Sequence, residues 1–564
     1  MTGRRHIPPR SPDQVMRFAR LGSFHQSRLS FMRQLLRRLA KESWRFETTT
    51  FDIDSRGVGH AIYTAHGPER PYSLVAFAHD LPPEDRSDRV IATAWDATFA
   101  LFDGVPDDAD IERLRANVPV QEEGRVSEKE LTLSRANRSV RLWDHVVSRL
   151  AAGEQPDAAL VDEVGYLMRT TAVYGSGKFG AADREAIAHR PECHAPFQVE
   201  MLTVYLIRTF VMDLVEHMAR MQAPDRAVAL TPEMRRRFGI GNSTGLGMAP
   251  FLVTHPALIN AWIGAREEAL SRVRSISRPS PDRVQIFRTC AARARQHAYG
   301  WHSEHPIQIE KLAGLRKDMD RLNAHLETAD LSADHAWNAL YLWAEDRLSV
   351  EGQEMLVSLL LEPHGHLVDE LSSCMAADET RVWQINGQMT TGALREILRD
   401  VYGWALALDW TQDNTQARVW YVSENKLEPR LGERFEEPLE PYEQPLCPGR
   451  DAARLYADLN ADLTTDEPVG AFLLRHPEHR HMTRRAQIAA LLPYAEIRDN
   501  TIDAVMMPID MLRTKLSFFG ASEFDPRSDR WVRITMFQHA PFPHELEDAF
   551  ADDWALPPLN MAAE

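Results

Sequence analysis

The chain has 564 residues, of which 44% are hydrophobic and 26% charged, and its 82 acidic and 65 basic side chains give a net charge of −17. A chain of this length is expected to form two to four domains, or one large fold with appendages, and its composition is ordinary for a globular protein in water. The acidic balance argues against non-specific nucleic-acid binding, because the phosphate backbone repels an acidic surface. Four scattered cysteines without a CxxC pair predict reduced thiols in a cytoplasmic protein rather than a disulfide framework.

The first predicted element is a basic amphipathic helical arm, residues 1–43. Apolar side chains recur at helical spacing from Ser11 to Glu42, and the opposite face is basic between Arg28 and Lys41. Such a helix can lie on a membrane surface or dock on an acidic partner. We expect it instead to pack on the protein's own core or to make an oligomer contact, because the rest of the chain is acidic.

Residues 44–104 predict a small antiparallel β meander. In this region the helical spacing is lost, and short runs rich in β-branched and aromatic residues are separated by turn residues. The strands are expected at 44–51, 58–64, 72–77 and 90–94, and residues 99–104 are a possible extension of the meander.

The remainder of the chain is predicted to be mainly helical. We divide it into a helical core with the candidate site, a helix with a β hairpin, a linker rich in proline and glutamate, and a C-terminal helical region with one strand and a frayed tail. These parts span 105–380, 381–432, 433–450 and 451–564, with hairpin strands at 404–410 and 417–422 and the last strand at 531–537. The fold class is therefore mainly α (α+β): a large helical core, a small antiparallel meander near the N-terminus and a short β hairpin in the C-terminal part.

The longest apolar segment, Phe197–Met221, predicts a helix that the rest of the protein nearly surrounds. Large apolar residues recur at spacings of three and four, and others fill most of the remaining circumference. The length would suit a membrane span, but the five charged residues within it would be costly in hydrocarbon, so we predict no membrane span. The acidic residues are expected to pair with basic ones a turn further on: Asp213 with His217 and Glu216 with Arg220.

A glycine-rich segment, Tyr174–Gly180, precedes this helix and predicts an anion-binding turn. The residues before it, 161–173, predict helix, and a short helix is expected directly after it at 181–188. A glycine-rich turn that leads into a helix N-terminus gathers backbone N–H groups, which favour an anion. The spacing is not that of a P-loop, and a tight connection between helices with a solvated lysine is the alternative. The candidate substrate-binding residues here are Gly175, Ser176, Gly177, Lys178 and Arg184.

A second glycine-rich segment, Gly239–Gly247, follows the central helix. The run Gly241-Asn-Ser-Thr-Gly245 fits the G-x-S-x-G pattern, which makes Ser243 a candidate nucleophile. That pattern requires a buried strand before it, and the residues from Met234 onward predict none. The polar side chains could instead hydrogen-bond a carboxylate or phosphate, or cap their own backbone as a polar turn. The candidate substrate-binding residues of this segment are Asn242, Ser243 and Thr244.

Histidines cluster four times along the chain, but none of the spacings matches a known zinc signature. We therefore predict no metal site, and the question stays open for two groups: His364 with His366, and His476 with His479 and His481. Cys193 precedes the central helix, whose N-terminus could activate a thiolate; an inert, partly buried cysteine is the alternative.

These features predict an enzyme acting on a small anionic metabolite, bearing a carboxylate or phosphate, that is held between the two glycine-rich segments. His194 or His255 would serve as general acid or base, because the pKa of a histidine lies near neutrality. The reaction (lyase, transferase or hydrolase) and any organic cofactor are left open. We expect a homo-oligomer without a nucleic-acid partner. The alternative is a non-catalytic helical scaffold or regulatory subunit of an oligomeric complex, in which both segments are turns.

Overall fold

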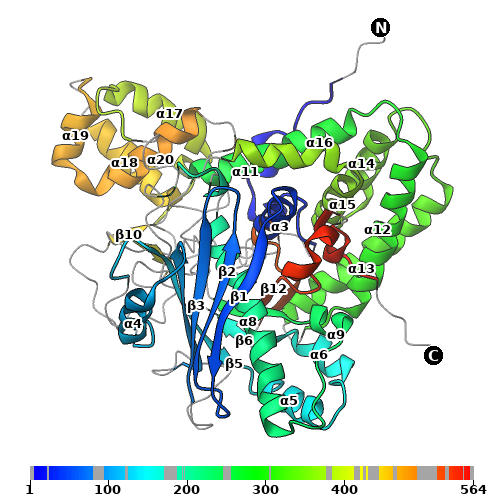
Figure 1. The fold of residues 1–564 in the computed structure, drawn as a ribbon. Coiled ribbons are helices and arrows are strands. Elements are labelled where there is room, and N and C mark those ends of the chain that lie inside the picture. Colours follow the sequence, from blue (N-terminus) through cyan, green and yellow to red (C-terminus); the bar gives the residue numbers. More distant parts are fainter. Residues whose placement is uncertain are drawn as a thin grey trace. The chain divides into compact units, whose positions relative to one another are not determined.

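The fold is that of a computed structural model (Figure 1). The chain forms two compact units that interleave in sequence. The sheet unit comprises His25–Ser243, Phe518–Asp525 and Val532–Glu564, and the helical unit comprises Met1–Phe24, Thr244–Ser517 and Pro526–Trp531. The structure describes residues 6–21, 25–80, 95–120, 125–170, 187, 189–193, 195, 197–244, 256–303, 306–375, 384–411, 420–422, 427–429, 444–446, 448–461, 466–491, 494, 517–526, 532–550 and 552–558.

A mixed sheet of nine strands organises the sheet unit, in the order β1-β2-β3-β4-β5-β6-β7-β12-β11. Neighbours from β1 to β6 run antiparallel, whereas β6 and β7 run parallel. The strands are β1 Arg45–Ile53, β2 Gly59–His66, β3 Pro71–Ala78, β4 Ala97–Asp103, β5 Glu130–Arg138, β6 Tyr166–Thr170, β7 Gly239–Thr244, β11 Glu523–Pro526 and β12 Val532–Met536.

The prediction of a small meander confined to 44–104 is therefore wrong. The first three predicted strands correspond to β1, β2 and β3, and the extension at 99–104 corresponds to β4. The sheet continues, however, through β5, β6 and β7 and takes its last two strands from the C-terminal part of the chain. The predicted strand 90–94 lies outside the described residues. Most residues of β3, β4 and β5 are buried, so these strands lack the alternation that marks a strand with one wet face. The pairing of β7 with β12 joins residues almost 300 positions apart, so no pattern within either segment indicates it.

Helices cover both faces of the first strands (Figure 1). On one face, α4 (Asp108–Asn117) packs through Leu114 against an apolar patch that includes Phe77 and Leu133. On the other face lies α8 (Gln198–Gln222), which contacts β2, β3, β5 and β6. Because both faces are covered, most residues in the middle of the sheet are removed from water.

The helix α8 begins and ends within one residue of the bounds predicted from its apolar period, and most of its residues are buried. Asp213 and Glu216 both bind Arg235, at 2.5 and 3.4 Å, and the charge of Arg220, one turn further along the helix, also acts on Glu216. Arg208 is fully buried and donates to backbone carbonyls, among them Phe238 O at 2.7 Å. None of the helices in the described part of the chain combines the length and the apolar composition needed to cross a membrane.

The predicted N-terminal helical arm is broken into three short helices: α1 Pro12–Val15, α2 Phe18–Leu21 and α3 Phe31–Lys41. Two arginines of the basic face of α3 are bound within the sheet unit. Arg33 and Arg37 both bind the carboxylate of Asp552 in the sheet unit, with Nη–Oδ2 distances of 2.8 and 2.6 Å. The apolar side of α3 is buried as well, so this helix is part of the protein's own core.

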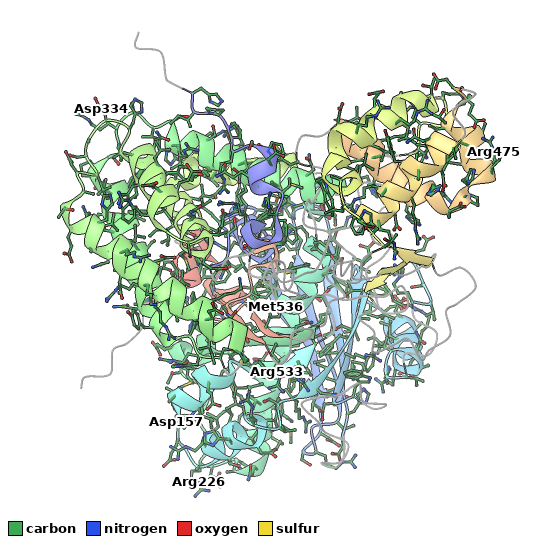
Figure 2. The ribbon with its side chains drawn as sticks, turned by 180° about the vertical axis from the view of Figure 1, so that it is seen from behind. Asp157, Arg226, Asp334, Arg475, Arg533 and Met536 are labelled. Carbon is green, nitrogen blue, oxygen red and sulfur yellow. The ribbon has the colours of Figure 1, made fainter. Side chains whose placement is uncertain are left out.

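Shorter helices complete the sheet unit. Asp157 accepts a hydrogen bond from Leu160 N and thereby caps one of them. After α8 the chain returns toward α5, and Arg226 Nε donates a hydrogen bond to Ala151 O at 3.3 Å. Figure 2 labels Asp157 and Arg226, together with Arg533 and Met536 of β12. These helices are α5 Trp143–Ala151, α6 Ala158–Val164, η2 Pro191–Cys193, α9 Pro232–Arg237, η6 Pro543–Phe550 and η7 Asp553–Ala555.

In the helical unit, a buried group of charges ties the N-terminal segment to two helices. Arg10 donates to Glu267 at 2.7 Å and to Glu354 at 2.7 Å. Arg20 and Arg266 bind the same Glu354. The helices of this part are α11 Pro256–Arg274, α12 Pro281–Gly300, α13 Pro306–Thr328, α14 Ala336–Arg347, α15 Val350–Leu361, η3 Glu362–His364, α16 Gly365–Val368 and η4 Asp369–Cys374.

The segment 384–491 of the helical unit forms a further cluster of helices around its own apolar core. The predicted strand 404–410 is wrong, because Leu398, Tyr402 and Ala405 are buried at helical spacing in α17. The predicted strand 417–422 overlaps β8, which belongs to a three-stranded sheet rather than to a hairpin. The elements are α17 Thr391–Leu406, β8 Trp420–Val422, β9 Leu427–Pro429, β10 Gln444–Leu446, α18 Pro448–Ala461, α19 Val469–Arg475, η5 Pro477–His479 and α20 Arg480–Leu491.

Candidate functional site

Most of the residues predicted to form the site lie outside the described residues: Gly175, Ser176, Gly177, Lys178, Arg184, His194 and His255. The three predicted residues of the second segment, Asn242, Ser243 and Thr244, lie in β7. Only for Asn242 is the side chain described. The first glycine-rich segment follows β6 in the sequence, and the second includes β7. The pairing of β6 with β7 therefore shows how the two parts of the chain next to these segments are arranged.

The strands β6 and β7 run parallel and end side by side. Arg169 is paired with Gly241 in the register, and the Asn242 side chain donates from Nδ2 to Thr170 O at 2.7 Å. Thr170 in turn shares a hydrogen bond with Ser134 of β5, with 2.7 Å between the hydroxyl oxygens. The prediction of helix at 161–173 is wrong for Tyr166–Thr170, whose residues are all buried in the sheet.

Two glycines of the second segment are explained by close packing of β7 in the sheet. A Cβ at Gly241 would lie 2.6 Å from Tyr166 Cγ and 2.8 Å from Arg169 Cγ. A Cβ at Gly239 would lie 2.6 Å from Thr535 Cγ2 of β12. Because real Cβ contacts are not this short, both positions require glycine for the strand to approach its neighbours. Gly241 therefore has a structural role that is independent of the G-x-S-x-G pattern.

Asn242 presents a buried acceptor next to the strand ends. Asn242 is 1% exposed. Because its amide nitrogen Nδ2 donates to Thr170 O, the orientation of the amide group is determined, and Oδ1 points away from this carbonyl. In the described part of the chain, Oδ1 has no hydrogen-bond partner. Buried amide oxygens are satisfied in most proteins, so this atom is suited to accept a hydrogen bond from a hydroxyl or amino group.

Polar side chains form a row across four neighbouring strands on the sheet face that α4 covers elsewhere. Asn137 of β5 is opposite Arg169 of β6, and Asp96, just before β4, donates its N–H to Asn137 Oδ1 at 3.4 Å. His79, just after β3, donates its N–H to Asp96 O at 2.7 Å. Because residues opposite each other share a face, an imidazole, a carboxylate, an amide and a guanidinium follow one another across four strands, each about 4.8 Å from the next.

Arg135 adds a second guanidinium to this face. It lies two residues before Asn137 on β5, so it points to the same side and is the diagonal neighbour of Arg169, a separation of roughly 7–8 Å. Its guanidinium stacks on Trp95, with 4.1 Å between Cζ and the ring centroid. Burial lowers the pKa of Arg135, yet the group keeps its charge at neutral pH. Arg135 and Arg169 thus place two guanidinium groups on this face of the sheet.

Asp96, the acidic residue of the row, forms a buried ion pair with Arg138. Asp96 is fully buried, accepts the Arg138 N–H at Oδ2 at 2.8 Å and lies 3.6 Å from Arg138 Nε. The Arg138 guanidinium also stacks on Trp143 at 4.7 Å. Asp96 is thus committed to holding the start of β4 against the end of β5, and we assign it a positioning role.

His79 is the histidine of the row. Burial lowers its pKa, so the ring is neutral at pH 7, and Nε2 lies 3.2 Å from Thr98 Oγ1. A neutral imidazole can accept a proton, which is the property a general base needs. The sequence analysis did not select His79, Asp96, Arg135, Asn137 or Arg169, because each is a single polar residue in or beside an apolar strand.

Cys193, considered as an activated thiolate, is buried in η2. Burial, together with the neighbouring carboxylate of Glu192, raises the pKa of the thiol to about 12. The thiolate is the reactive form of cysteine, and at neutral pH this residue is a protonated thiol. The alternative of an inert buried cysteine therefore holds.

A separate cavity of about 320 Å³ lies on the sheet face covered by α8, lined by β1, β2, α8, Arg235 and residues 542–544. Its charged groups are already engaged with one another. Asp213 accepts from Tyr63 Oη at 2.9 Å and from Arg235 Nη2 at 2.5 Å, and Arg235 stacks on Phe542 at 5.0 Å. An anion entering this cavity would have to compete with Asp213 for Arg235.

Comparison with known proteins does not assign this chain to a family. No family model matches the sequence, and neither the curated proteins nor the solved structures include a significant match.

Proposed function

We propose that the protein is an enzyme acting on a small anionic metabolite, a carboxylate or a phosphate ester, bound beside the ends of β6 and β7. The observation that carries the proposal is the placement of Arg135 and Arg169 as diagonal neighbours on one sheet face of a protein whose net charge is −17. Two arginines whose backbones are this close on one face can both reach one carboxylate or phosphate with charge-assisted hydrogen bonds.

His79 belongs to the same row on this sheet face. His79, neutral at pH 7 because it is buried, would act as general base. The substrate is expected to carry an anionic group together with a proton that a neutral imidazole can accept, as hydroxy acids, amino acids and sugar phosphates do.

The predicted glycine-rich segment fits the same proposal by its place in the sequence. Tyr174–Gly180 follows β6 after three residues, so Lys178 and Arg184 would add positive charge near the end of that strand. Ser243 and Thr244 end β7 beside it. His194 and His255 remain predictions for acid–base roles, and the reaction type is left open.

The test begins with thermal unfolding of the purified protein in the presence of inorganic phosphate and a set of carboxylates and phosphate esters. We expect at least one of them to raise the unfolding temperature. For that ligand, Arg135→Gln and Lys178→Ala should each raise the dissociation constant by about tenfold to a hundredfold, because a hydrogen bond to a charged group contributes about 1.5–3 kcal/mol.

Arg149→Gln is the matched control. Arg149 is an exposed arginine of the same unit, paired with Glu154 at 2.7 Å, and its replacement should leave binding unchanged. Unaltered affinity in both Arg135→Gln and Lys178→Ala would remove the proposal. So would an equal loss in Arg149→Gln, because the effect would then reflect overall charge alone.

A further inference from the structure

Four potential metal ligands gather in the helical cluster of residues 384–491. They are Asp458 of α18, His476 at the end of α19, and Glu478 and His479 of η5. One ligand atom from each lies within 4.8 Å of the others. His481, which the sequence grouped with the two histidines, is not part of the cluster. Asp458 was missed because it comes from a different helix, 18 residues before His476.

The local fold explains why both imidazoles lie on the same side. In a 3₁₀ helix, residues three apart are eclipsed, and His476 caps η5 while His479 ends it. Phe472 of α19 stacks on both rings, at centroid distances of 4.7 and 5.9 Å. Since Phe472 is fully buried in the core of this cluster, the two imidazoles are held against a rigid surface.

Each imidazole already faces a carboxylate. His479 Nε2 lies 2.7 Å from Asp458 Oδ2, and His476 Nδ1 lies 3.4 Å from Glu478 Oε1. In a tetrahedral zinc site the bonds are about 2.0–2.2 Å, which places neighbouring ligand atoms about 3.3 Å apart. The cluster is therefore close to coordination geometry, and small side-chain rotations would complete it.

The charge and exposure of the cluster also suit a divalent cation. Two carboxylates with two neutral imidazoles carry a charge of −2, which one divalent ion neutralises. The adjacent Arg475, labelled in Figure 2, binds Glu467. His479 is buried, whereas the side chains of Asp458 and Glu478 are about half exposed at 46% and 53%, so an ion can enter from solvent.

We propose that Asp458, His476, Glu478 and His479 bind one Zn²⁺ ion in a four-coordinate structural site. Imidazole favours zinc and its neighbours in the transition series over magnesium and calcium, which prefer oxygen donors. With all four positions taken by protein ligands, the ion is closed to substrate. It links α18 to the α19–η5 turn and adds its binding free energy to the stability of this helical cluster.

The test uses the full chain, stripped with a chelator and titrated with Zn²⁺ against a chromophoric competitor. We expect one ion per chain, a rise in the unfolding temperature on zinc addition, and the intense visible absorption of tetrahedral Co²⁺ when cobalt replaces zinc. His476→Ala and Asp458→Asn should each weaken zinc binding by at least about tenfold, since even second-shell changes weaken metal sites by 10- to 100-fold. Both replaced side chains are partly exposed, so these variants are expected to fold.

His481→Ala is the matched control, because it removes an exposed histidine of the adjacent helix that is not part of the cluster. It should bind zinc as the parent protein does. Failure of the parent protein to retain zinc would overturn the proposal. So would an equal loss of affinity in His481→Ala and His476→Ala, or the weak spectrum of six-coordinate cobalt.

Discussion

At the scale of single residues, the stability of both units depends on buried carboxylates that face several guanidinium groups. Asp552 binds Arg28, Arg33 and Arg37, and it is almost completely removed from water. Glu354 has the same role in the helical unit, where it binds three arginines. Removing one partner of a buried pair leaves an uncompensated charge, which costs more than the pair itself contributes.

Glu354→Gln should therefore lower the free energy of unfolding by about 3–5 kcal/mol. Burial by itself would raise the pKa of Glu354, but Arg10, Arg266 and Arg20 lower it to about 2. The pKa of this side chain in the unfolded chain is about 4.5. Between pH 2 and pH 4.5 the folded state therefore binds fewer protons than the unfolded state. The stabilisation is fully present above pH 4.5 and is lost as the pH falls toward 2.

Urea unfolding at pH 7 and at steps down to pH 2 measures both effects. The parent protein should lose stability steeply below pH 4.5, and Glu354→Gln should show a shallower slope. Glu327→Gln changes an exposed glutamate of α13 and should stay within about 0.5 kcal/mol of the parent. If Glu354→Gln and the parent protein unfold at the same urea concentration, the buried pairs do not stabilise the fold as described.

At the scale of elements, sequence patterns predicted the helices better than the sheet. The period of α8 was visible because its apolar residues repeat every three or four positions over 25 residues. The short strand β6 was read as helix, since five buried residues without alternation fit either structure. Of the predicted site residues, Asn242, Ser243 and Thr244 lie in β7. The row of His79, Asp96, Asn137 and Arg169 could not be predicted, because it exists only once the strand register is known.

The close approach of β6 and β7 makes a second prediction. In Gly241→Ala, the added methyl group would overlap Tyr166 and Arg169, and overpacking of this kind costs about 1–3 kcal/mol. We expect a lower unfolding temperature. We also expect weaker binding of any ligand found by thermal shift, because displacing Arg169 changes the proposed site.

Gly314→Ala is the control for the effect of the glycine replacement itself. Gly314 lies in α13, and a Cβ there would meet no atom within 4 Å. Alanine is the better helix former by roughly 1 kcal/mol, so this variant should be equally stable or more stable. A Gly241→Ala protein as stable as the parent would show that β7 can move away from β6 without cost.

At the scale of the whole molecule, the interleaved order of the two units limits how the chain can be divided. The sheet unit needs β12, which lies next to β7 in the sheet although residue 532 is almost 300 residues further along the chain. It also needs Asp552 to neutralise the arginines of α3. Neither requirement is visible in the sequence of residues 25–243, which is why composition and linkers suggested consecutive domains.

A fragment of residues 25–243 should therefore fail to fold alone. It leaves one edge of β7 unpaired and the buried Arg33 without its carboxylate, and the cost of the buried charge alone is several kcal/mol. Circular dichroism should show no cooperative thermal transition. Joining residues 25–243 to 518–558 through a long glycine–serine linker should restore one, and a cooperative transition in the shorter fragment would contradict the assignment of β12 to this sheet.

The position of β12 also sets the order of events during translation. When β7 emerges from the ribosome, its neighbour on one side has not yet been made. At about 5–20 residues per second, β12 follows roughly 15–60 s later. For that time the growing polypeptide exposes an open strand edge, to which chaperones or other nascent chains can add.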